Sequence, residues 1–448
     1  MEPHIVILGG GFAAVAAAAK LERLLSQDEA SITLVSRENF SLFTPMLPEV
    51  SSGEIDTRHV VTPIRTQLRR TQFILAEVMA IDFQQRRVGF VHTLRGSSDS
   101  IAYDQLVLAL GSVSSTFGLP GVAERVFALK TLEDAGILRN RFMWLLELAD
   151  TIPDTLERRT LLCIVIVGGG FTGVEAAGEM VDLFKNVVRF YRNLRASDIR
   201  IILVEGGGTL LSGLPPKMGS YSMRDLQRRG VEVIVGDGVA RADDDALILA
   251  SGRRIQTKTV VWSAGVRSSP LLAQTMLPHG RGGTISTARD MSVPGFAGVW
   301  ALGDCAAIPD GNGGVYPQTA QHAIRQGPVV ARNIVATLRA KPTQKFRYTS
   351  LGMMASLGGH KAVAQLPGER VLSGFWAWVL WRTYYLSRLP GLDRKLRVAF
   401  DWTLELLFPR DISELRVYSK RAQSSAVIDA GLVPRDAAAS IEPSDVKA

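Results

Sequence analysis

The sequence contains few cysteines and histidines, which excludes several kinds of protein. Its 448 residues include two cysteines, Cys163 and Cys305, and no Cys-x-x-Cys motif. Neither a disulfide framework nor a dithiol centre is therefore expected, and a reducing compartment fits. The six histidines are scattered without metal-ligand spacing, so no metal site is expected. A Gly-x-Ser-x-Gly nucleophile elbow and a Walker phosphate loop are also missing.

The sequence also lacks a targeting segment and a membrane-spanning run. Residues 1–4 lead directly into an apolar stretch, so no signal peptide is expected. The apolar segment 372–386 is interrupted by Arg382 and falls short of the roughly 20 residues that a spanning helix needs. Basic residues and a second apolar stretch, 398–408, follow it, and four of the seven tryptophans come after residue 370. This pattern predicts an interfacial amphipathic segment.

Charge narrows the choice of partner. The net charge is +8, yet no nucleic-acid-binding motif and no long Lys/Arg run accompanies it. An anionic membrane surface is therefore favoured over nucleic acid. Residues 419–448, rich in Ala, Ser, Pro and charge, are predicted to form a disordered tail.

A glycine motif near the N-terminus predicts a dinucleotide site. Gly9-x-Gly11-x-x-Ala14 follows an apolar run and opens an Ala-rich stretch, which is the order strand, turn, helix. The first glycine permits a tight turn, the second lets the backbone approach a pyrophosphate, and the small Ala14 lets helix and strand pack closely. The next strand ends at Ser36-Arg37-Glu38 instead of an acid. Ser36 or Glu38 is a candidate for the ribose, and three solvent-facing turn residues are the alternative.

The same arrangement recurs in the middle of the chain. Gly168-x-Gly170-x-x-Gly173 follows the apolar run 163–167, and the next strand, 201–204, ends at Glu205. A carboxylate there accepts both ribose hydroxyls of NAD and repels a 2′-phosphate, so NADH is predicted over NADPH. The spacing to Glu205 exceeds the usual ~20 residues, which predicts an extended connecting helix.

Two acidic residues accompany the motifs. Glu175 is expected in the first turn of the second helix, either with a functional role or as an N-terminal acid favoured by the helix dipole. Asp304 follows the apolar run 299–302 and Gly303. A carboxylate at the end of a buried strand can bind a polyol. The alternative interpretation is that Asp304 belongs to an ordinary turn at the end of the strand.

A polar helix is predicted within residues 317–327. Gln321 and Arg325 would share one face, and His322 and Gln326 the neighbouring one. Such groups beside a flavin can bind a carbonyl acceptor, whereas a solvated helix face remains the simpler interpretation.

These features predict an α/β protein with two Rossmann-like dinucleotide-binding domains, glutathione-reductase-like, and a C-terminal membrane-associating segment. The domain of the first fingerprint is expected to be discontinuous, formed by residues 1–115 and 268–345. Residues 116–267 would form the domain of the second fingerprint, and residues 346–418 the C-terminal membrane-interaction region. The family resemblance described next makes these the FAD-binding domain, the NAD(H)-binding domain and the quinone- and membrane-interaction region.

Together the motifs resemble those of the type II NADH dehydrogenases, the non-proton-pumping NADH:quinone oxidoreductases, from about residue 5 to residue 418. Beyond the fingerprints, the resemblance lies in short stretches spread along the chain, which begin at Phe43, Leu108, Lys130, Trp262, Ala301, Ala320, Gly359 and Leu372. The glycine motifs alone would indicate only the wider superfamily of flavoproteins with two dinucleotide sites.

The resemblance implies FAD, NADH and a membrane quinone as ligands. For FAD it implies contacts with Gly9, Gly11, Phe12, Ala14, Ser36, Arg37, Pro45, Gly111, Lys130, Asp304 and Ala320. For NADH it implies Gly168, Gly170, Phe171, Thr172, Gly173, Glu175, Glu205, Ala264 and Gly265. For the quinone it implies Ala320, Gln321 and Arg325, and for catalysis Glu175, Gln321 and Lys361. It also implies attachment of the protein to the cytoplasmic face of the cell membrane. The protein is considered a possible homodimer.

Three positions depart from the family pattern. Ser36 stands where many relatives have an acid, Phe171 where proline is common, and Arg325 where a second glutamine is common. The last departure leaves the identity of the quinone open. Three other functions are considered. The first is a sulfide:quinone-type oxidoreductase, which needs a cysteine pair at the flavin. The others are another FAD- and NAD(P)H-dependent reductase, such as a ferredoxin or rubredoxin reductase, and a redox-sensing NAD-binding protein.

Overall fold

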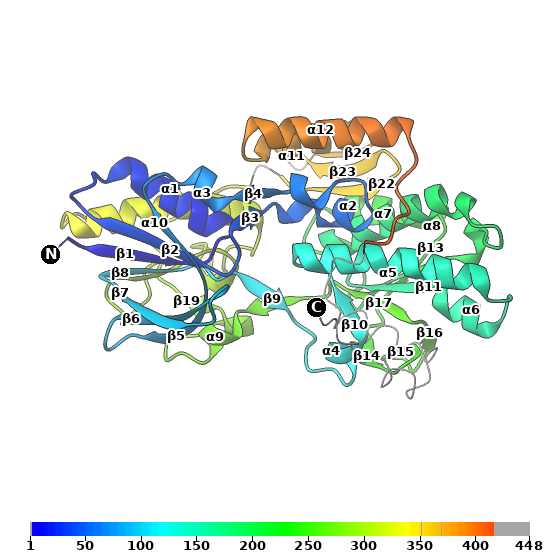
Figure 1. Cartoon of the computed structure of the whole chain (residues 1–448), viewed down its shortest axis with the longest axis horizontal. Coiled ribbons are helices and arrows are strands. Elements are labelled where there is room, and N and C mark those ends of the chain that lie inside the picture. The colour runs from blue at the N-terminus through cyan, green and yellow to red at the C-terminus, as the bar shows by residue number, and fades with distance from the viewer. Residues whose placement is uncertain (1, 351, 369, 416–448) are drawn as a thin grey trace, which may run out of the picture.

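The computed structural model describes residues 2–350, 352–368 and 370–415, so the predicted tail lies outside the described residues. Two α/β lobes lie side by side, and a third layer made of C-terminal elements covers them from above (Figure 1). The chain enters the first lobe, crosses to the second, returns to the first and then forms the covering layer.

The first lobe contains a seven-stranded sheet in the order β20-β8-β1-β2-β5-β6-β7. Its five strands from β20 to β5 are parallel, and β6 and β7 extend it as antiparallel strands. The central strands β1 and β8 and the edge strand β20 are apolar runs, because side chains on both of their faces are buried in one core. The strands are β1 His4–Leu8, β2 Ser31–Ser36, β5 Gln72–Asp82, β6 Arg87–His92, β7 Ser98–Ala102, β8 Gln105–Leu108 and β20 Val299–Ala301.

Two helices from opposite ends of this lobe's sequence pack tightly against each other. They are α1, Phe12–Leu24, and α10, Ala320–Leu338. Gly327 makes the close approach possible, since a Cβ on it would lie 2.6 Å from the Ala13 carbonyl oxygen and 2.7 Å from the Ala17 nitrogen. The segment predicted to contact a quinone is thereby fixed to the helix that begins at the first fingerprint.

The second lobe contains a five-stranded parallel sheet in the order β10-β17-β11-β12-β13. A three-stranded antiparallel sheet, β14-β15-β16, lies beside it. The strands are β10 Val126–Ala128, β11 Cys163–Val167, β12 Arg200–Glu205, β13 Val231–Val235, β14 Val239–Ala242, β15 Ala246–Leu249, β16 Arg254–Gln256 and β17 Thr259–Trp262.

Two antiparallel strands carry the chain between the lobes: β9, Ser112–Ser114, pairs with β18, Val266–Ser268. This pairing holds the two dinucleotide-binding sheets in one frame, and β9 is visible as the bridge in Figure 1. The predicted fold class, two Rossmann-like units in an α/β protein, is confirmed. The domain boundaries stay predictions.

The remaining short elements cover the sheets and connect them. They are β3 Phe40–Leu42, β4 Val61–Pro63, β19 Ile285–Ser286, β21 Ala306–Ala307, α2 Leu47–Ser51, α3 Ile64–Gln67, α4 Val122–Arg125, α5 Leu132–Thr151, α6 Leu156–Leu161, α8 Pro216–Arg228 and α9 Pro270–Ala273.

The predicted extension of the helix after the second fingerprint accounts for part of the long connection to β12. Helix α7, Phe171–Val187, has 17 residues where α1 has 13, and a 3-10 turn at 188–190 continues it. The rest is a loop that contains a second 3-10 turn at 196–198, because spacing alone does not distinguish a longer helix from a longer loop.

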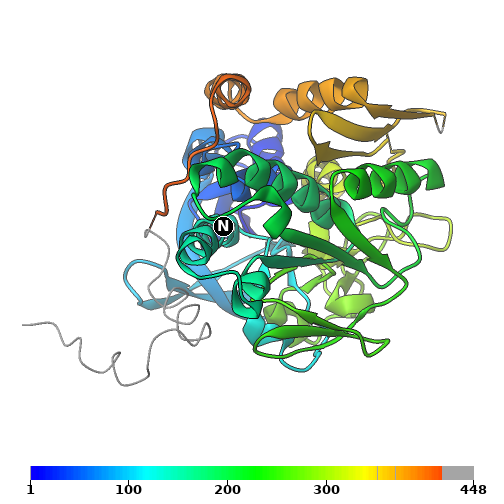
Figure 2. The same cartoon turned by 90° about the vertical axis from the view of Figure 1, so that its right-hand side faces the viewer.

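The C-terminal layer contains a sheet that the sequence analysis did not predict. Strands β22 Met354–Gly358, β23 Lys361–Gln365 and β24 Val371–Gly374 form an antiparallel meander. Helices α11, Phe375–Arg388, and α12, Leu392–Leu407, follow it and lie along the top of the molecule (Figures 1 and 2).

This layer shares its hydrophobic core with the second lobe. Leu357 and Val363 from the meander and Trp381 and Trp402 from the two helices belong to one buried cluster with α7 and α2. The C-terminal region is thus an integral part of the molecule. None of the helices in the described part of the chain is both long and apolar enough to cross a membrane.

Candidate active site

The first fingerprint forms a cradle that fits a dinucleotide. Gly9 has φ +115°, and a Cβ on it would lie 2.2 Å from the Ala109 carbonyl oxygen, so only glycine permits this turn. A Cβ on Gly11 would meet no atom within 4 Å, and the same holds for Gly111 on the neighbouring loop. The space in front of both glycines lies at the N-terminus of α1, where backbone N–H groups favour a phosphate. These residues fit the pyrophosphate of FAD.

Asp304 lies next to this cradle with two partners from distant segments. Its Oδ2 accepts a hydrogen bond from the Ser112 hydroxyl at 2.9 Å and lies 3.4 Å from the Lys130 Nζ. The N–H of Gly303 donates to Gln326 Oε1 at 2.8 Å, which attaches the turn to α10. The Asp304 carboxylate lies just after β20 and is partly exposed, so a polyol could reach it. The interpretation as an ordinary strand-end turn does not explain these convergent side chains.

Ser36 does not face solvent. This excludes the alternative that Ser36, Arg37 and Glu38, at the end of β2, are all solvent-facing turn residues. Ser36 is 7% exposed, its hydroxyl accepts the N–H of Glu38 at 3.3 Å, and it packs beneath Gly10. Arg37 is exposed. The buried Ser36 hydroxyl lies where Rossmann sheets usually carry an acid that binds the ribose. The contact of Ser36 with the ribose of FAD stays a prediction.

The second fingerprint repeats the geometry of the first. Gly168 has φ +111°, and a Cβ on Gly173 would lie 1.8 Å from the Gly168 carbonyl oxygen, so strand and helix touch there. A Cβ on Gly170 would meet no atom within 4 Å. Each carboxylate oxygen of Glu205 accepts one backbone N–H, from Gly169 and from Gly207, at 2.6 Å. Both bonds fix the acid at the end of β12, where a ribose would bind.

Other predicted nucleotide contacts lie on the edges of the two cradles. Phe12 and Phe171 are the first residues of α1 and α7, and Thr172 follows Phe171. Pro45 lies in a 3-10 turn, and Ala264 and Gly265 follow β17. Their contacts with FAD and NADH stay predictions.

Glu175 lies in the second turn of α7, and not in the first as predicted, because the helix begins at Phe171. The helix dipole therefore does not explain it. The side chain is buried, and Oε1 accepts the N–H of Ser356 from the C-terminal meander at 3.1 Å. Burial raises the pKa of Glu175 to about 8, although the Ser356 N–H opposes the shift. Glu175 is thus protonated at neutral pH, in keeping with the predicted functional role.

The predicted polar helix exists as the start of α10. Arg325 Nη1 donates to the Gln321 carbonyl at 2.7 Å, Gln321 Oε1 accepts the Tyr348 hydroxyl at 2.9 Å, and Arg325 stacks on the Tyr348 ring at 4.3 Å. Ala320 is the first residue of the helix, and Gln321 and Arg325 are half-buried. The face is therefore ordered by a neighbouring segment, and its contact with a quinone stays a prediction.

Lys361 forms an ion pair within the protein. Its Nζ lies 2.7 Å from the Oδ1 of Asp225, which is fully buried in α8. The pair ties β23 to the second lobe. Its predicted place beside the flavin is not tested by this contact and stays a prediction.

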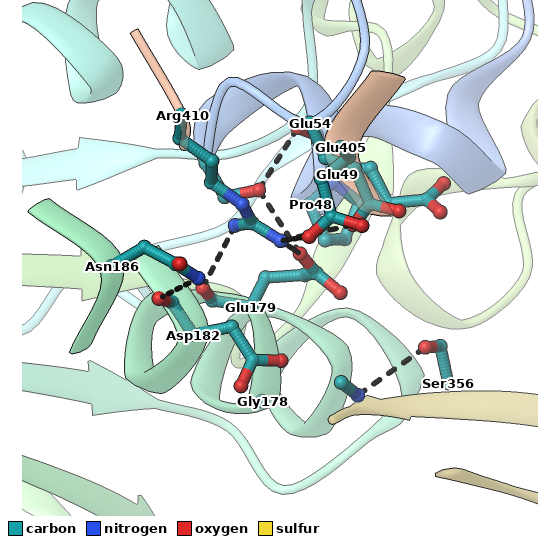
Figure 3. Close-up of polar contacts among 12 residues, drawn as sticks. Pro48, Glu49, Glu54, Gly178, Glu179, Asp182, Asn186, Ser356, Glu405 and Arg410 are labelled. Carbon is teal, nitrogen blue, oxygen red and sulfur yellow. Dashed lines mark hydrogen bonds and ion pairs between the residues drawn. The ribbon is translucent and has the colours of Figure 1, made fainter. Parts of the chain in front are cut away.

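Sequence reasoning missed a buried cluster of charged residues above α7. Nη2 of Arg410 lies 3.1 Å from a carboxylate oxygen of each of Glu54, Glu179 and Glu405, and Figure 3 shows it among these acids. Burial lowers the pKa of Arg410, but the acids, Glu179 foremost, outweigh it and raise the value. Arg382 joins the cluster at 2.6 Å from Glu54.

Two signals could have identified this cluster. Glu49 stands between Pro48 and Val50 in an apolar segment, and Glu179 follows Glu175 by four residues, on the same face of a helix. Acids at apolar positions are rarely fully buried unless they are paired or neutral.

Comparison with known proteins agrees with this geometry. Residues 3–327 match the model of the pyridine nucleotide-disulphide oxidoreductase family, and residues 351–411 match the NDH2 C-terminal domain. A type II NADH:quinone oxidoreductase, Ndh, of Mycobacterium tuberculosis is 33% identical over 91% of this chain and 89% of its own length. The chain belongs to the type II NADH:quinone oxidoreductase family.

Two further matches support this family. A probable NADH dehydrogenase of Dictyostelium discoideum is 32% identical over 91% of this chain and 90% of its own length. The fold matches the structure of NDH2 from Plasmodium falciparum in complex with NADH, with a TM-score of 0.84 at 19% identity, over 92% of this chain and 100% of that one. The predicted family and class of enzyme, FAD-dependent NADH:quinone oxidoreductases, are confirmed.

The two cysteines do not fit the rival sulfide chemistry. Cys163 begins β11 in the second lobe and Cys305 lies in the core of the first, and both are buried free thiols. Burial raises the pKa of each thiol to about 11, so neither is a thiolate at neutral pH. A type II NADH:quinone oxidoreductase needs no such pair.

Exchanging one glycine in each cradle should separate the two sites. Gly11→Ala should lower the flavin content of the purified protein, because its Cβ would occupy the space for the pyrophosphate. Gly170→Ala should leave the flavin content unchanged and raise the KM for NADH about tenfold, the effect of losing ~1.4 kcal/mol of binding. Neither Cβ would meet protein atoms, so the melting temperature of the apoprotein should not change. Equal loss of flavin in both variants would contradict the assignment.

The pKa of Glu175 predicts a pH-dependent stability. Between its ordinary pKa of 4.5 and about 8, the folded protein holds a proton that the unfolded chain releases, so the free energy of unfolding falls as pH rises across this window. Glutamine cannot ionise. Glu175→Gln should therefore be more stable than the wild type, by roughly 3 kcal/mol at pH 7 and less at pH 5.

Denaturant unfolding from pH 5 to pH 8 measures this difference. Glu157→Gln, a substitution of an exposed acid on α6, is the control and should show no comparable gap. Parallel curves for Glu175→Gln and the wild type at every pH would contradict the burial-driven shift.

Proposed function

We propose that the protein oxidises NADH with a bound FAD and reduces a membrane quinone, as its family membership indicates. The observation that carries the proposal is the pair of open glycine cradles, at Gly11 and Gly170, in sheets joined by β9 and β18. Each cradle fits one dinucleotide, and the chain brings both together with a buried protonated acid, Glu175. FAD, when bound, supplies the redox chemistry by accepting hydride and passing on two electrons.

The residues of the first lobe hold the flavin nucleotide in this proposal. The N-terminus of α1 faces the pyrophosphate across Gly11, and Asp304 with Ser112 binds the polyol chain. Lys130, 3.4 Å from Asp304, compensates the charge of that acid and of a neighbouring phosphate.

The second lobe positions the donor. The N-terminus of α7 faces the pyrophosphate of NADH, and Glu205 accepts the ribose hydroxyls with the lone pairs that its two backbone bonds leave free. Its negative charge disfavours the 2′-phosphate of NADPH. We propose residues 1–115 with 268–345 and residues 116–267 as the corresponding domains.

The acceptor side lies at α10 and beneath the C-terminal layer. Gln321 offers an amide to a quinone carbonyl, and Arg325 adds a positive charge that favours a quinol anion. Glu175 supplies a proton, because its raised pKa keeps it protonated at neutral pH. The quinone itself is not specified by these groups.

Anaerobic stopped-flow mixing tests the whole route. Holoenzyme mixed with NADH should lose its flavin absorbance within one turnover, and a water-soluble quinone added next should restore it. NADPH should react more slowly, and Glu205→Arg should reduce the preference for NADH. Flavin that NADH reduces but quinone does not reoxidise would favour a redox-sensing role instead.

The C-terminal helices have the surface expected of a membrane contact. Leu392, Leu396 and Phe400 repeat every four residues along α12 and are 72%, 62% and 61% exposed, whereas Val398 and Trp402 on the opposite side are buried. A surface helix normally shows solvent its polar side. The apolar outer side of α12 therefore fits insertion into the headgroup region of a bilayer.

Basic residues lie along the same helices. Arg388 and Arg397 are exposed and Lys395 is half-buried, near the apolar side chains of α12. They would attract anionic lipid headgroups. We propose a monotopic association with the cytoplasmic face of the cell membrane, where such lipids and NADH are both present.

Replacing two exposed leucines of α12 tests the attachment. Leu392→Glu with Leu396→Glu should lose binding to anionic vesicles in a pelleting assay, because two charges would enter the apolar boundary. NADH:ferricyanide activity, which needs no lipid, should be retained. Leu156→Glu, at a leucine of 71% exposure on α6, is the matched control and should pellet like the wild type. Wild-type pelleting of the double variant would contradict the proposed surface.

A further inference from the structure

Glu49 is a second buried acid in the cluster above α7. It lies in α2, is 3% exposed, and its Oε2 has no hydrogen-bond partner among the described residues. Nε of Arg410 also lacks a partner within the described chain, and the buried indole N–H groups of Trp402 and Trp381 face Glu49 and Glu175. An ionised carboxylate with an unpaired oxygen is costly in such surroundings, whereas a neutral carboxyl group is tolerated.

The charges of the cluster do not balance unless protons are bound. Its cations are the two guanidinium groups of Arg382 and Arg410, which contact Glu54, Glu179 and Glu405. No ion pair reaches Glu49 or Glu175 among the described residues. The cluster therefore contains five carboxyl groups and two cations, so three protons would balance its charge. Glu49 and Glu175, which have no cationic contact, are two of the expected carriers. Glu54 is the third, because burial and the neighbouring acids raise its pKa well above the usual range.

The groups that face Glu49 agree with this assignment. Burial raises the pKa of Glu49 well above its usual range, the charge of Glu179 raises it further, and Arg382 opposes both. Glu175, from α7, also raises it, and the Trp402 indole, from α12, lowers it. Glu54, Glu405 and Arg410 complete the surrounding charges, as Figure 3 shows for the acids around Arg410.

Tyr385 of α11 packs against the hydrophobic core that contains α2 and α7, the helices of Glu49 and Glu175. Burial raises the pKa of its phenol, and the charges of Glu175, Tyr384 and Glu49 raise it further, so both acids are near it. Its ring packs edge-on against Phe43, with centroids 6.0 Å apart, and lies 4.8 Å from Trp381. A phenol both donates and accepts a hydrogen bond, so it can pass a proton between two carboxyl groups.

The proposed reaction requires one proton that NADH does not bring. A hydride carries two electrons and one proton, so the balance is NADH + H⁺ + quinone → NAD⁺ + quinol. We propose, resting on the function proposed above, that Glu49 is a positioning residue that holds this second proton and reprotonates Glu175 through Tyr385. The O–H bond of Glu175 breaks as it protonates the acceptor, a proton from Glu49 re-forms it, and solvent reprotonates Glu49.

Half-reaction kinetics of Glu49→Gln test this role. NADH should reduce the holoenzyme at the wild-type rate, because that step needs no relay. Reoxidation by a water-soluble quinone should slow at least tenfold, the low end of what a positioned acid contributes. Turnover with ferricyanide, which takes electrons without protons, should stay within twofold of the wild type. Glu49→Asp should restore part of the quinone rate, and Tyr385→Phe should show the same selective defect.

A matched control keeps the comparison specific. Glu147 accepts the Tyr191 hydroxyl at 3.0 Å on α5, outside the cluster, so Glu147→Gln removes a carboxylate from another Glu–Tyr pair. It should leave reoxidation by quinone unchanged. A wild-type quinone rate and pH profile in Glu49→Gln would overturn the proposal. Failure of the wild-type enzyme itself to reduce quinone would instead overturn the proposed function.

Infrared spectroscopy provides a test that does not depend on turnover. Protonated carboxyl groups absorb at the carbonyl stretch, apart from carboxylates, and the band shifts in deuterated water. At pH 7 the wild type should show a band that Glu49→Gln lacks and Glu147→Gln keeps. Identical carboxyl bands in the wild type and Glu49→Gln would mean that Glu49 is ionised, which would also overturn the proposal.

Discussion

The contact between Arg410 and three glutamates is the interaction on which the proposed active site depends. Glu54 follows α2, Glu179 lies in α7 and Glu405 lies in α12, so one buried guanidinium joins segments that are distant in the sequence. Removing one partner from a buried pair typically costs about 3–5 kcal/mol, because the other charge stays buried without compensation. The contact holds the C-terminal layer on α7, and Ser356 and Trp381 of that layer lie next to Glu175. The low dielectric that keeps Glu175 protonated is thus created by residues from the end of the chain.

The two nucleotide cradles follow from one physical rule applied twice. Each needs a glycine in the left-handed region to turn, and a second glycine whose missing Cβ leaves room for a phosphate. They differ at the end of the next strand, where Glu205 carries a charge and Ser36 does not. In the proposed function this difference would give the donor site its selectivity for NADH, and the flavin site would use Asp304, which follows the edge strand β20.

Much of this architecture could be predicted from the sequence because it is local. The run Cys163–Val167 became β11 with the same bounds, and both fingerprints formed the expected turns. The turn of α7 that contains Glu175 was predicted wrongly, and the extension of α7 accounts for only part of the long connection, since spacing does not fix where a helix begins and ends. The C-terminal meander was missed because its strands are short and, as in β22, buried on both faces, so their residues do not alternate between apolar and polar. The Arg410 cluster was missed because ion pairs between residues 54, 179 and 410 leave no periodic signal.

The C-terminal layer belongs to the same core as α7 around Glu175 and is not an attached anchor. Native-state hydrogen exchange, measured amide by amide in the wild-type holoenzyme, tests this most directly. We expect the slow amides of β23 and α11 to exchange with the same opening free energy as those of α7 around Glu175, since all three elements share one hydrophobic core. Exchange of β23 and α11 at a clearly lower free energy, with α7 still protected, would contradict it.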